Sequence, residues 1–206
     1  MNAESRESHM KRVTVAITGA SGAIYALRTL RALLMYGVAV DVVISEFGWR
    51  LLREEGAFEG KQQDFGAFIE DRFEVPVDDL TLHSLKDLGA TLASGSARSN
   101  GMVVVPCSMK TLAGIAHGLS RNLIERSADV TLKERRPLIV VPRETPMSLI
   151  HLRNMVAATE AGAVMVPAMP AFYQIPESFD DLADFIVGRI LSLLQIEHDL
   201  YPAWEG

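Results

Sequence analysis

Short apolar runs alternate with longer amphipathic segments along most of this chain. Runs of mainly β-branched residues cover Arg12–Thr18, Val38–Ile44, Met102–Pro106, Pro137–Pro142 and Ala163–Pro167. Each run has the length of a strand and is apolar at nearly every position, and segments with a helical period separate the runs. Uniformly apolar strands joined by helices are typical of a parallel sheet that is covered on both faces. The pattern therefore predicts one doubly wound α/β domain.

The strand ends indicate where such a domain would bind a ligand. In a doubly wound sheet, ligands bind outside the carboxyl ends of the strands. The predicted ends lie at Thr18, Ser45, Pro106, Pro142 and Pro167. We therefore expect the functional residues in the loops that follow these five positions.

Two further stretches differ from this alternation. Between Gly56 and Ser99 the periodicity weakens, and we predict one short helix from about Asp64 to Phe73 within a surface excursion. Near the C-terminus, an amphipathic pattern predicts a final helix over Phe179–Ile196, with Ser178 as its N-cap.

Composition narrows the class of partner. The 206 residues carry a net charge of −6, which argues against a nucleic-acid surface or an anionic membrane surface, because both need a broad positive field. No run approaches the roughly 18 apolar residues of a membrane span. Cys107 is the only cysteine, so no internal disulfide can form, and a cytoplasmic protein is expected. Residues 1–10 are polar and are predicted to be a disordered tail before a single domain over residues 11–206.

The loop after the first predicted strand has the composition of an anion-binding turn. Gly19, Ala20, Ser21 and Gly22 open the next helix, and their small side chains would let backbone N–H groups approach a phosphate. A tight turn without a ligand can have the same sequence, so the glycine pattern alone does not decide. A nicotinamide reductase of the short-chain type is not expected, because no tyrosine is followed four residues later by lysine.

Two more strand ends carry hydroxyl groups. Ser45 follows the second run, and Ser108 and Thr111 follow the third. These hydroxyls could bind a ligand that lies across the sheet, or they could cap helices. We interpret Cys107 as a buried structural residue, and we expect no metal site because the histidines lack metal-ligand spacing and cysteine partners.

Cationic residues gather on the predicted helix before the fourth strand. Arg126 and Lys133 are seven residues apart, so they project from one helical face and could bind a phosphate group. Asp129 lies between them and could neutralise both instead. Arg143 and Glu144 directly follow the next strand, where Glu144 could accept a proton or simply pair with Arg143.

One cation is expected on the apolar face of the final helix. Arg189 lies in line with Leu182 and Phe185, so its charge requires an anion, either a ligand or a carboxylate such as that of Asp184. Tyr173, in the loop after the last strand, could add a phenol donor.

Several runs, taken together, resemble the UbiX-type flavin prenyltransferases. The similarity is carried by TGASGAIYALR, PCSMKTLAGIAHG, NLIERSADVTLKERRPLIVVPRETP, HLRNM and GAVMVPAMPAFYQIP, which follow one another in this order over Thr18–Pro176. The resemblance implies a flavodoxin-like, Rossmann-like fold without a metal. It also implies reduced FMN as the acceptor, dimethylallyl monophosphate as the donor, and prenylated FMN as the product. That product would serve a UbiD-type decarboxylase, in ubiquinone synthesis or in aromatic-acid metabolism.

The resemblance also implies roles for particular residues. FMN would contact four strand ends, through Gly19, Ala20, Ser21, Ser45, Ser108, Met109, Lys110, Thr111 and Arg143. The prenyl phosphate would be bound by Arg126, Lys133, Tyr173 and Arg189, with Glu55 and Trp204 near the same site. Catalysis is expected from these four donors together with Ser21 and Glu144. Whether Glu144 or the released phosphate moves the protons stays open.

The chemistry of these side chains agrees with that reaction. Four donors around one phosphate would stabilise the charge that grows on the leaving group. Apolar and aromatic walls would shield an allylic cation from water. The expected course is attack by flavin N5 on the allyl carbon, loss of phosphate, and ring closure at flavin C6. Arg135 and Arg136 are interpreted as surface charges.

Two alternatives are weighed against this interpretation. FMN-dependent cysteine decarboxylases share the fold, but their loop typically reads like PASANT where this chain has PCSMKT, and their PxMNxxMW segment is absent. A non-catalytic FMN-binding module would have no use for Arg126, Lys133 and Arg189. The family resemblance implies a homo-oligomer, commonly a dodecamer, with sites shared between subunits. The residues themselves leave open whether the donor is a monophosphate or a pyrophosphate.

Overall fold

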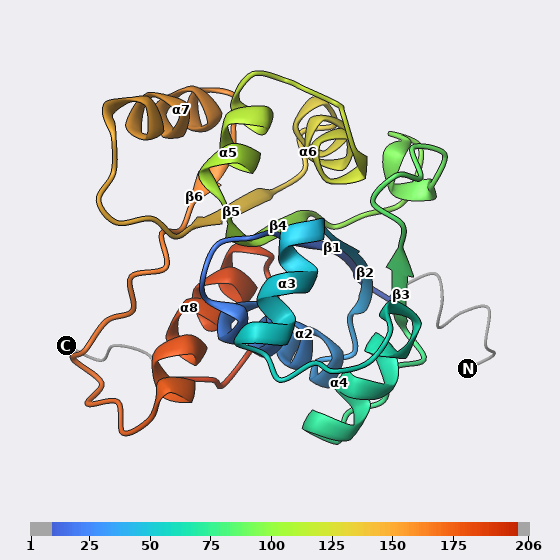
Figure 1. The fold of residues 1–206 in the computed structure, drawn as a ribbon, viewed down its shortest axis with the longest axis vertical. Helices are drawn as coiled ribbons and strands as arrows, with labels where there is room; N and C mark the ends of the chain where they lie inside the picture. Colours follow the sequence, from blue (N-terminus) through green and yellow to red (C-terminus); the bar gives the residue numbers. More distant parts are fainter. Residues whose placement is uncertain (1–9, 202–206) are drawn as a thin grey trace.

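Six strands form one parallel sheet in the computed structural model, which describes residues 10–201 (Figure 1). The strands are β1 (Arg12–Ile17), β2 (Ala39–Ile44), β3 (Leu80–His83), β4 (Met102–Cys107), β5 (Leu138–Pro142) and β6 (Val164–Met165). Their order across the sheet is β3-β2-β1-β4-β5-β6, and every neighbouring pair is parallel. The chain winds from the middle to one edge and then to the other, so the predicted doubly wound, flavodoxin-like or Rossmann-like class is confirmed. The direction of winding reverses between β1 and β4.

Helices of the described residues cover both faces of the sheet (Figure 1). One face carries α2 (Ala23–Met35), α3 (Glu46–Glu54), α4 (Phe65–Phe73) and α8 (Phe179–Leu193). The other face carries α5 (Met109–Ala116), α6 (Leu123–Lys133) and α7 (Leu149–Glu160). Two single-turn 3₁₀ helices, η1 (Gln62–Asp64) and η2 (Thr91–Ala93), lie in the connections on either side of β3. None of the helices in the described part combines the length and apolarity that a bilayer crossing requires.

Successive strand residues point to opposite faces, and both faces are apolar cores. Val13, Val15 and Ile17 of β1 are fully buried in the core that α2, α3, α4 and α8 complete. Ala16 of β1 and Val104 of β4 belong to the other core, against α5 and α6. Burial on both faces explains why the strands are apolar at nearly every position in the sequence.

The predicted surface excursion between Gly56 and Ser99 contains a strand that the sequence pattern does not predict. β3 has only four residues, it lies at the edge of the sheet, and Thr81 and His83 alternate with leucines. The predicted helix at Asp64 to Phe73 is confirmed as α4.

The ends of α8 are set by local chemistry. Its predicted N-cap is confirmed, because Ser178 Oγ accepts a hydrogen bond from the N–H of Asp181 at 3.1 Å. The helix ends at Leu193 rather than at Ile196, and Gln195 takes a left-handed conformation with φ of 56°.

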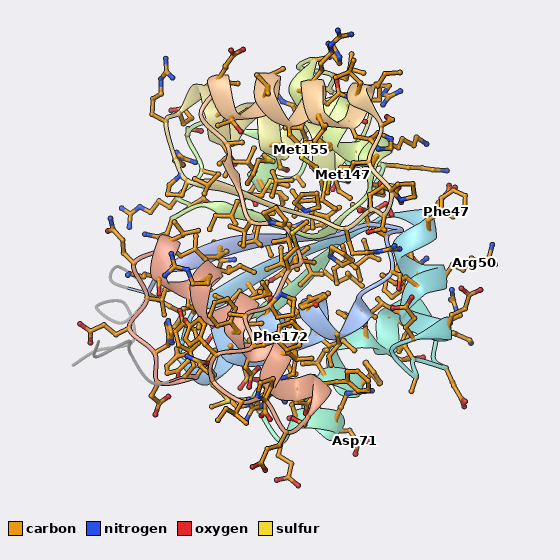
Figure 2. All side chains as sticks on the ribbon, turned by 90° about the vertical axis from the view of Figure 1, so that its left-hand side faces the viewer. Phe47, Arg50, Asp71, Met147, Met155 and Phe172 are labelled. Atoms are coloured by element: carbon orange, nitrogen blue, oxygen red, sulfur yellow. The ribbon has the colours of Figure 1, made fainter. Side chains whose placement is uncertain are left out.

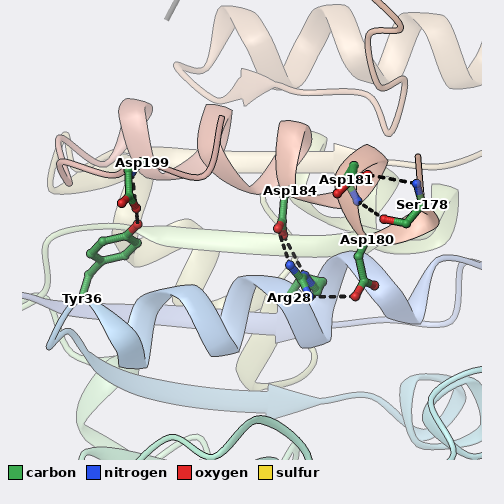
Figure 3. A network of polar contacts seen from close by, with 7 residues as sticks. All are labelled: Arg28, Tyr36, Ser178, Asp180, Asp181, Asp184 and Asp199. Atoms are coloured by element: carbon green, nitrogen blue, oxygen red, sulfur yellow. Dashed lines mark hydrogen bonds and ion pairs between the residues drawn. The ribbon is translucent and has the colours of Figure 1, made fainter. Parts of the chain in front are cut away.

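Ion pairs hold α8 against α2 (Figure 3). Arg28 of α2 donates from Nε to Asp184 Oδ1 at 2.7 Å and from Nη2 to Asp184 Oδ2, and its Nη1 lies 2.9 Å from Asp180 Oδ2. The side chains of Arg28 and Asp184 are only 14% and 15% exposed. Tyr36 at the end of α2 bonds to Asp199 beyond α8 (Figure 3). These contacts fix the position of α8 and of the loop that leads into it.

Candidate active site

A buried threonine joins the loops after β1 and β4. Thr18 Oγ1 donates a hydrogen bond to Pro106 O at 2.7 Å and accepts one from the N–H of Ser108 at 2.8 Å. Thr18 is 1% exposed, so water does not compete for these bonds. The two loops are therefore fixed to each other at the point where the winding of the sheet reverses.

A cavity of about 360 Å³ opens beside these loops, at the carboxyl ends of the strands. Its lining brings together five of the predicted FMN contacts, which are Gly19, Ser45, Ser108, Lys110 and Thr111. The first turns of α3 and α5 begin at this cavity, and the backbone N–H groups of such turns favour an anion. The cavity therefore suits the phosphate end of a nucleotide.

The two serine hydroxyls at this cavity are also helix caps. Ser45 Oγ accepts from the N–H of Gly48 at 3.0 Å, and Ser108 Oγ accepts from the N–H of Thr111 at 3.3 Å. The expected capping is therefore observed, and the same two residues line the cavity, so capping does not remove them from a ligand's reach. Ser45 Oγ, which accepts from a backbone N–H, still has its own proton to donate to a ligand. Ser108 Oγ donates its proton to Thr111 Oγ1 at 3.1 Å, so the Thr111 hydroxyl carries the proton that faces outward from this pair.

The cavity wall is formed by an unusually close approach of α3 to the loop after β1. A Cβ atom at Gly19 would lie 2.2 Å from Cβ of Phe47, so only glycine fits there. Phe47 itself is 61% exposed and projects outward from the start of α3 (Figure 2). An aromatic side chain therefore stands at the mouth of the cavity.

A buried carboxylate that the sequence did not indicate also lines the cavity. Glu125 is 3% exposed, and it accepts three hydrogen bonds from Arg121, from the backbone N–H at 3.0 Å, Nε at 3.1 Å and Nη2 at 2.7 Å. Burial alone would raise the pKa of Glu125, but the hydrogen bonds and charge of Arg121 lower it below its ordinary value. The pair is thus ionised and largely compensated, so Glu125 does not exclude an anion from the cavity.

The N-terminus of α2 holds a carboxylate of the chain itself. Glu55 Oε2 accepts from the N–H groups of Gly22 at 2.8 Å and of Ala23 at 3.1 Å. Burial would raise the pKa of Glu55, but hydrogen bonds from Gly22, Ser21 and Ala23 lower it. Gly22 has a φ of 124°, which a side chain would strain. The anion at these two N–H groups is therefore Glu55, and not a ligand phosphate as the loop sequence suggested.

Arg143 and Glu144 do not form the pair that the sequence left possible. Arg143 Nε donates to the carbonyl of Ser21 at 3.0 Å. Glu144 is half-buried, and its Oε1 accepts from the N–H of the following residue, Thr145, at 3.1 Å. Ser21, Glu55 and Arg143 thus form one cluster over the loop after β1, with Glu144 next to it in the chain.

Arg126 and Lys133 lie over the end of η2 and the residues that follow it. Arg126 donates from Nε to Ala93 O at 3.1 Å and from Nη1 to Asp129 at 2.9 Å. A Cβ atom at Gly95 would lie 3.1 Å from Lys133 Nζ, so both cations reach the same segment, as their shared face predicts. Lys133 pairs with Glu134 at 3.3 Å, so Asp129 neutralises Arg126 but not both cations.

Tyr173 and Arg189 lie on the opposite side of the sheet. Tyr173 contacts Phe185 of α8 edge to face, with 6.0 Å between ring centroids. The prediction that Arg189 lies on an apolar face is wrong, because Arg189 is exposed. Leu182 and Phe185, on the same side of α8, are only half-buried, so this side of the helix lies at the rim of the core. Since α6 and α8 cover different faces, a single chain does not bring the four predicted phosphate donors together (Figure 1).

Three other predicted residues have different outcomes. The side chain of Met109 is 9% exposed and packs in the core, so only its backbone is available to a ligand. Cys107 is fully buried, and burial raises the pKa of its thiol, which confirms the structural interpretation. Trp204 lies outside the described residues.

Comparisons with known proteins place the chain in a family. The flavoprotein family model matches residues 1–191. A flavin prenyltransferase UbiX from Halalkalibacterium halodurans is 48% identical over 191 residues, which are 93% of this chain and 92% of the relative. A crystal structure of AnUbiX (PadA1) in complex with FMN and dimethylallyl pyrophosphate has 41% sequence identity and a TM-score of 0.85, over 96% of this chain and 99% of its own. A dodecameric FMN-dependent UbiX-like decarboxylase from Escherichia coli O157:H7 has 40% identity and a TM-score of 0.82, over 95% and 100%.

The chain is thus a flavoprotein, with a nucleotide-type cavity at the point where its sheet reverses direction. The relatives that share 40% to 48% of their residues with it over nearly the whole chain are flavin prenyltransferases. The chain belongs to the UbiX flavin prenyltransferases, and it is an enzyme of that class. The resemblance in the sequence is confirmed.

Proposed function

We propose that this chain transfers a dimethylallyl group from dimethylallyl monophosphate to N5 and C6 of reduced FMN. The observation that carries the proposal is the cavity at the carboxyl ends of the strands, where hydroxyl groups and two helix N-termini converge. Membership of the UbiX family supports the same reaction. The prenylated product would pass to a UbiD-type decarboxylase, and we expect both proteins in the cytoplasm.

The residues present fit FMN. Ser45, Ser108, Lys110 and Thr111 would hold its phosphate at the start of α5, since these donors line one cavity. Arg143, which already contacts Ser21, would lie toward the ring system. Reduced FMN, when bound, supplies the two nucleophilic atoms that take the dimethylallyl group.

The prenyl phosphate site is proposed to form between subunits. Arg126 and Lys133 of one chain would face Tyr173 and Arg189 of another, because α6 and α8 lie on opposite sides of the sheet. Four donors around one phosphate would stabilise the negative charge that develops as the allylic C–O bond breaks. That number of donors suits a single phosphate group, which is the reason for proposing the monophosphate.

Glu144 is proposed as the group that moves the proton. Glu144 comes two residues after the end of β5, next to Arg143, whose side chain reaches the loop after β1. Glu144 itself is half-buried. Ring closure would add a proton to one carbon of the dimethylallyl double bond while flavin C6 bonds to the other carbon and loses its own proton. The Glu144 carboxylate could accept the proton from C6, so the two proton transfers balance. The released phosphate is the alternative acceptor.

The activity is tested directly. The protein is incubated without oxygen with reduced FMN and dimethylallyl monophosphate, and the flavin is analysed by mass spectrometry. A flavin heavier by one dimethylallyl group is expected, and a folded, FMN-loaded protein that gives no such product would refute the proposal. Dimethylallyl pyrophosphate is tested in parallel, and faster transfer from it would overturn the choice of monophosphate.

Mixed oligomers test whether the site is shared. Arg126→Ala and Arg189→Ala are each expected to lose activity when assembled alone. If the two arginines of a site come from different chains, random co-assembly of the variants restores roughly a quarter of the sites. If both come from one chain, every site keeps a lesion and activity does not recover. Mixing Arg126→Ala with Lys133→Ala is the control. Both residues reach a site from the α6 helix of one and the same chain, so every site keeps one of the two substitutions and no recovery is expected.

A further inference from the structure

Polar side chains form a row across three neighbouring strands, away from the cavity of about 360 Å³ proposed to hold FMN, which is called the FMN cavity below. Thr14 of β1 is in register with Asp41 of β2, and Asp41 is in register with Thr81 of β3. Residues in register on parallel strands point to the same face of a sheet. Thr14 and Asp41 are 3% and 5% exposed, in strands whose other residues are almost all apolar. A charged residue is rarely buried in the middle of a strand unless it is paired, so the surroundings of Asp41 need an explanation.

This row forms the floor of a second cavity, of about 410 Å³. Thr131 near the end of α6, Arg136 after it and the segment 91–99 form the other walls. The cavity shares no lining residue with the FMN cavity. The FMN cavity takes its α6 residues from the start of that helix, and the second cavity takes them from the end, so the two are separate sites.

Asp41, on the floor of this cavity, already has hydrogen-bonding partners within the chain. Arg12 Nη1 lies 3.2 Å from both carboxylate oxygens of Asp41, and His83 Nε2 lies 2.8 Å from Oδ1. Burial alone would raise the pKa of Asp41, but the hydrogen bond from His83 and the charge of Arg12 lower it. Asp41 is therefore ionised and compensated, and it does not require a cation from solution.

The remaining charge of the lining is positive. The residues that line the cavity include three arginines, Arg12, Arg98 and Arg136, and Asp41 as the one carboxylate among them. Arg98 is exposed, and Arg136 donates from Nη2 to Gly95 O at 2.7 Å. The interpretation of Arg136 as a plain surface charge is therefore wrong. An excess of guanidinium groups in a chain with a net charge of −6 is a local feature that favours an anion.

We propose that this second cavity binds a small phosphate dianion, either inorganic phosphate or a phosphate monoester. The arginines come from the sheet, from the segment 91–99 and from beyond α6, so donors approach from three walls. That arrangement suits a tetrahedral ion better than a planar carboxylate, which is bound by a guanidinium in one plane. The hydroxyl of Thr14 would donate a further hydrogen bond to it, whereas Thr131 Oγ1 donates its proton to Ser127 O at 2.7 Å and only lines the wall. The proposal does not depend on prenyl transfer.

Arg98 allows a clean test, because it is exposed and its loss should leave the fold intact. The full-length, FMN-loaded protein is titrated with inorganic phosphate by calorimetry, as wild type and as Arg98→Ala. We expect Arg98→Ala to weaken one class of binding by about tenfold while the melting temperature and the rate of prenyl transfer stay unchanged. Arg98→Lys, which keeps the charge, should retain more of the affinity. Arg153→Ala, on the exposed face of α7, should bind as wild type does.

A second variant distinguishes phosphate binding in this cavity from phosphate binding at the proposed prenyl phosphate site. Arg189→Ala should keep, at wild-type affinity, the class of phosphate binding that Arg98→Ala weakens. Wild-type phosphate binding in Arg98→Ala, by affinity and stoichiometry, would overturn the proposal. Glycerol 3-phosphate in place of phosphate identifies whether an ester is preferred. Succinate that bound this class as tightly as phosphate does would overturn the assignment to a tetrahedral anion.

Discussion

At the level of single residues, Glu55 has a direct effect on the loop after β1. Its carboxylate takes two N–H groups that no helical carbonyl can satisfy, and so it caps α2 from outside the helix. The first predicted effect is on stability. Glu55→Ala should lower the free energy of unfolding by about 1 kcal/mol, as the loss of other helix caps does. Glu54→Ala is the control, since Glu54 pairs only with Arg50 on the exposed side of α3.

The effect of Glu55 should depend on pH in a defined direction. Its pKa in the folded state is lowered, so its stabilising effect is complete above its unfolded pKa of about 4.5 and is lost as the pH falls through the folded value. Urea unfolding of wild type and Glu55→Ala should therefore differ most at neutral pH and converge in acid. A difference that stays constant down to acid pH would show that the carboxylate charge is not the cause.

Glu144→Gln tests the proposed proton acceptor. The amide keeps the size of the side chain but cannot take a proton, so FMN binding should persist while transfer slows by roughly 100-fold. Flavin fluorescence measures binding, and single-turnover mass analysis measures transfer. Unchanged transfer would assign the proton to the released phosphate.

Some site residues could be predicted from the sequence, and others could not. The hydroxyls at Ser45 and Ser108 follow strands directly, so their place at the sheet edge is a matter of chain order. Asp41 and Thr14 are far apart in sequence, and only the strand register brings them into one row. Arg189 follows the helical period, but the period alone does not show where an apolar stripe reaches the rim of the core.

At the level of elements, the contact between α2 and α8 positions part of the proposed site. Arg28 is mostly buried and forms two hydrogen bonds to Asp184, so its removal leaves a carboxylate without its partner. Arg28→Ala should destabilise the protein by about 3 kcal/mol. The double variant with Asp184→Asn should lose less than the sum of the two single losses. Strict additivity in chemical denaturation would show that the pair is not coupled.

The elements that the sequence predicts best are those buried on both faces. β1, β2, β4 and β5 are continuous apolar runs, because each lies inside the sheet with helices on both sides. β3 escapes prediction because an edge strand of four residues leaves a weak pattern, and its pairing with β2 depends on distant residues.

At the level of the whole molecule, α7 presents an apolar face without cover in the single chain. Leu149, Ile150, Leu152 and Val156 are 59%, 68%, 45% and 57% exposed. Large apolar side chains gathered on one helix mark an interaction surface, and the proposed sharing of the prenyl phosphate site between subunits makes further copies of this chain the expected partner.

Charged substitutions on α7 should therefore reduce the size of the assembly. Ile150→Lys with Val156→Lys is expected to give smaller species by light scattering, with helical content retained by circular dichroism. Prenyl transfer should fall with assembly, since the proposed phosphate site is shared. Met35→Lys, on an exposed position of α2, is the control and should assemble normally. A full-size assembly of the α7 variant would show that subunits meet elsewhere.

The carboxylate at the start of α2 also bears on which nucleotides the chain admits. In dinucleotide-binding sheets, the helix after the first strand receives the pyrophosphate. Here a negative charge already occupies that place, supplied by the residue that ends α3. We expect electrostatic exclusion of NAD and FAD, and retention of a mononucleotide whose single phosphate goes to α5 instead. Selectivity for a mononucleotide would then come from the Glu55 carboxylate, which takes the place of a ligand phosphate at α2, and not from the size of the cavity.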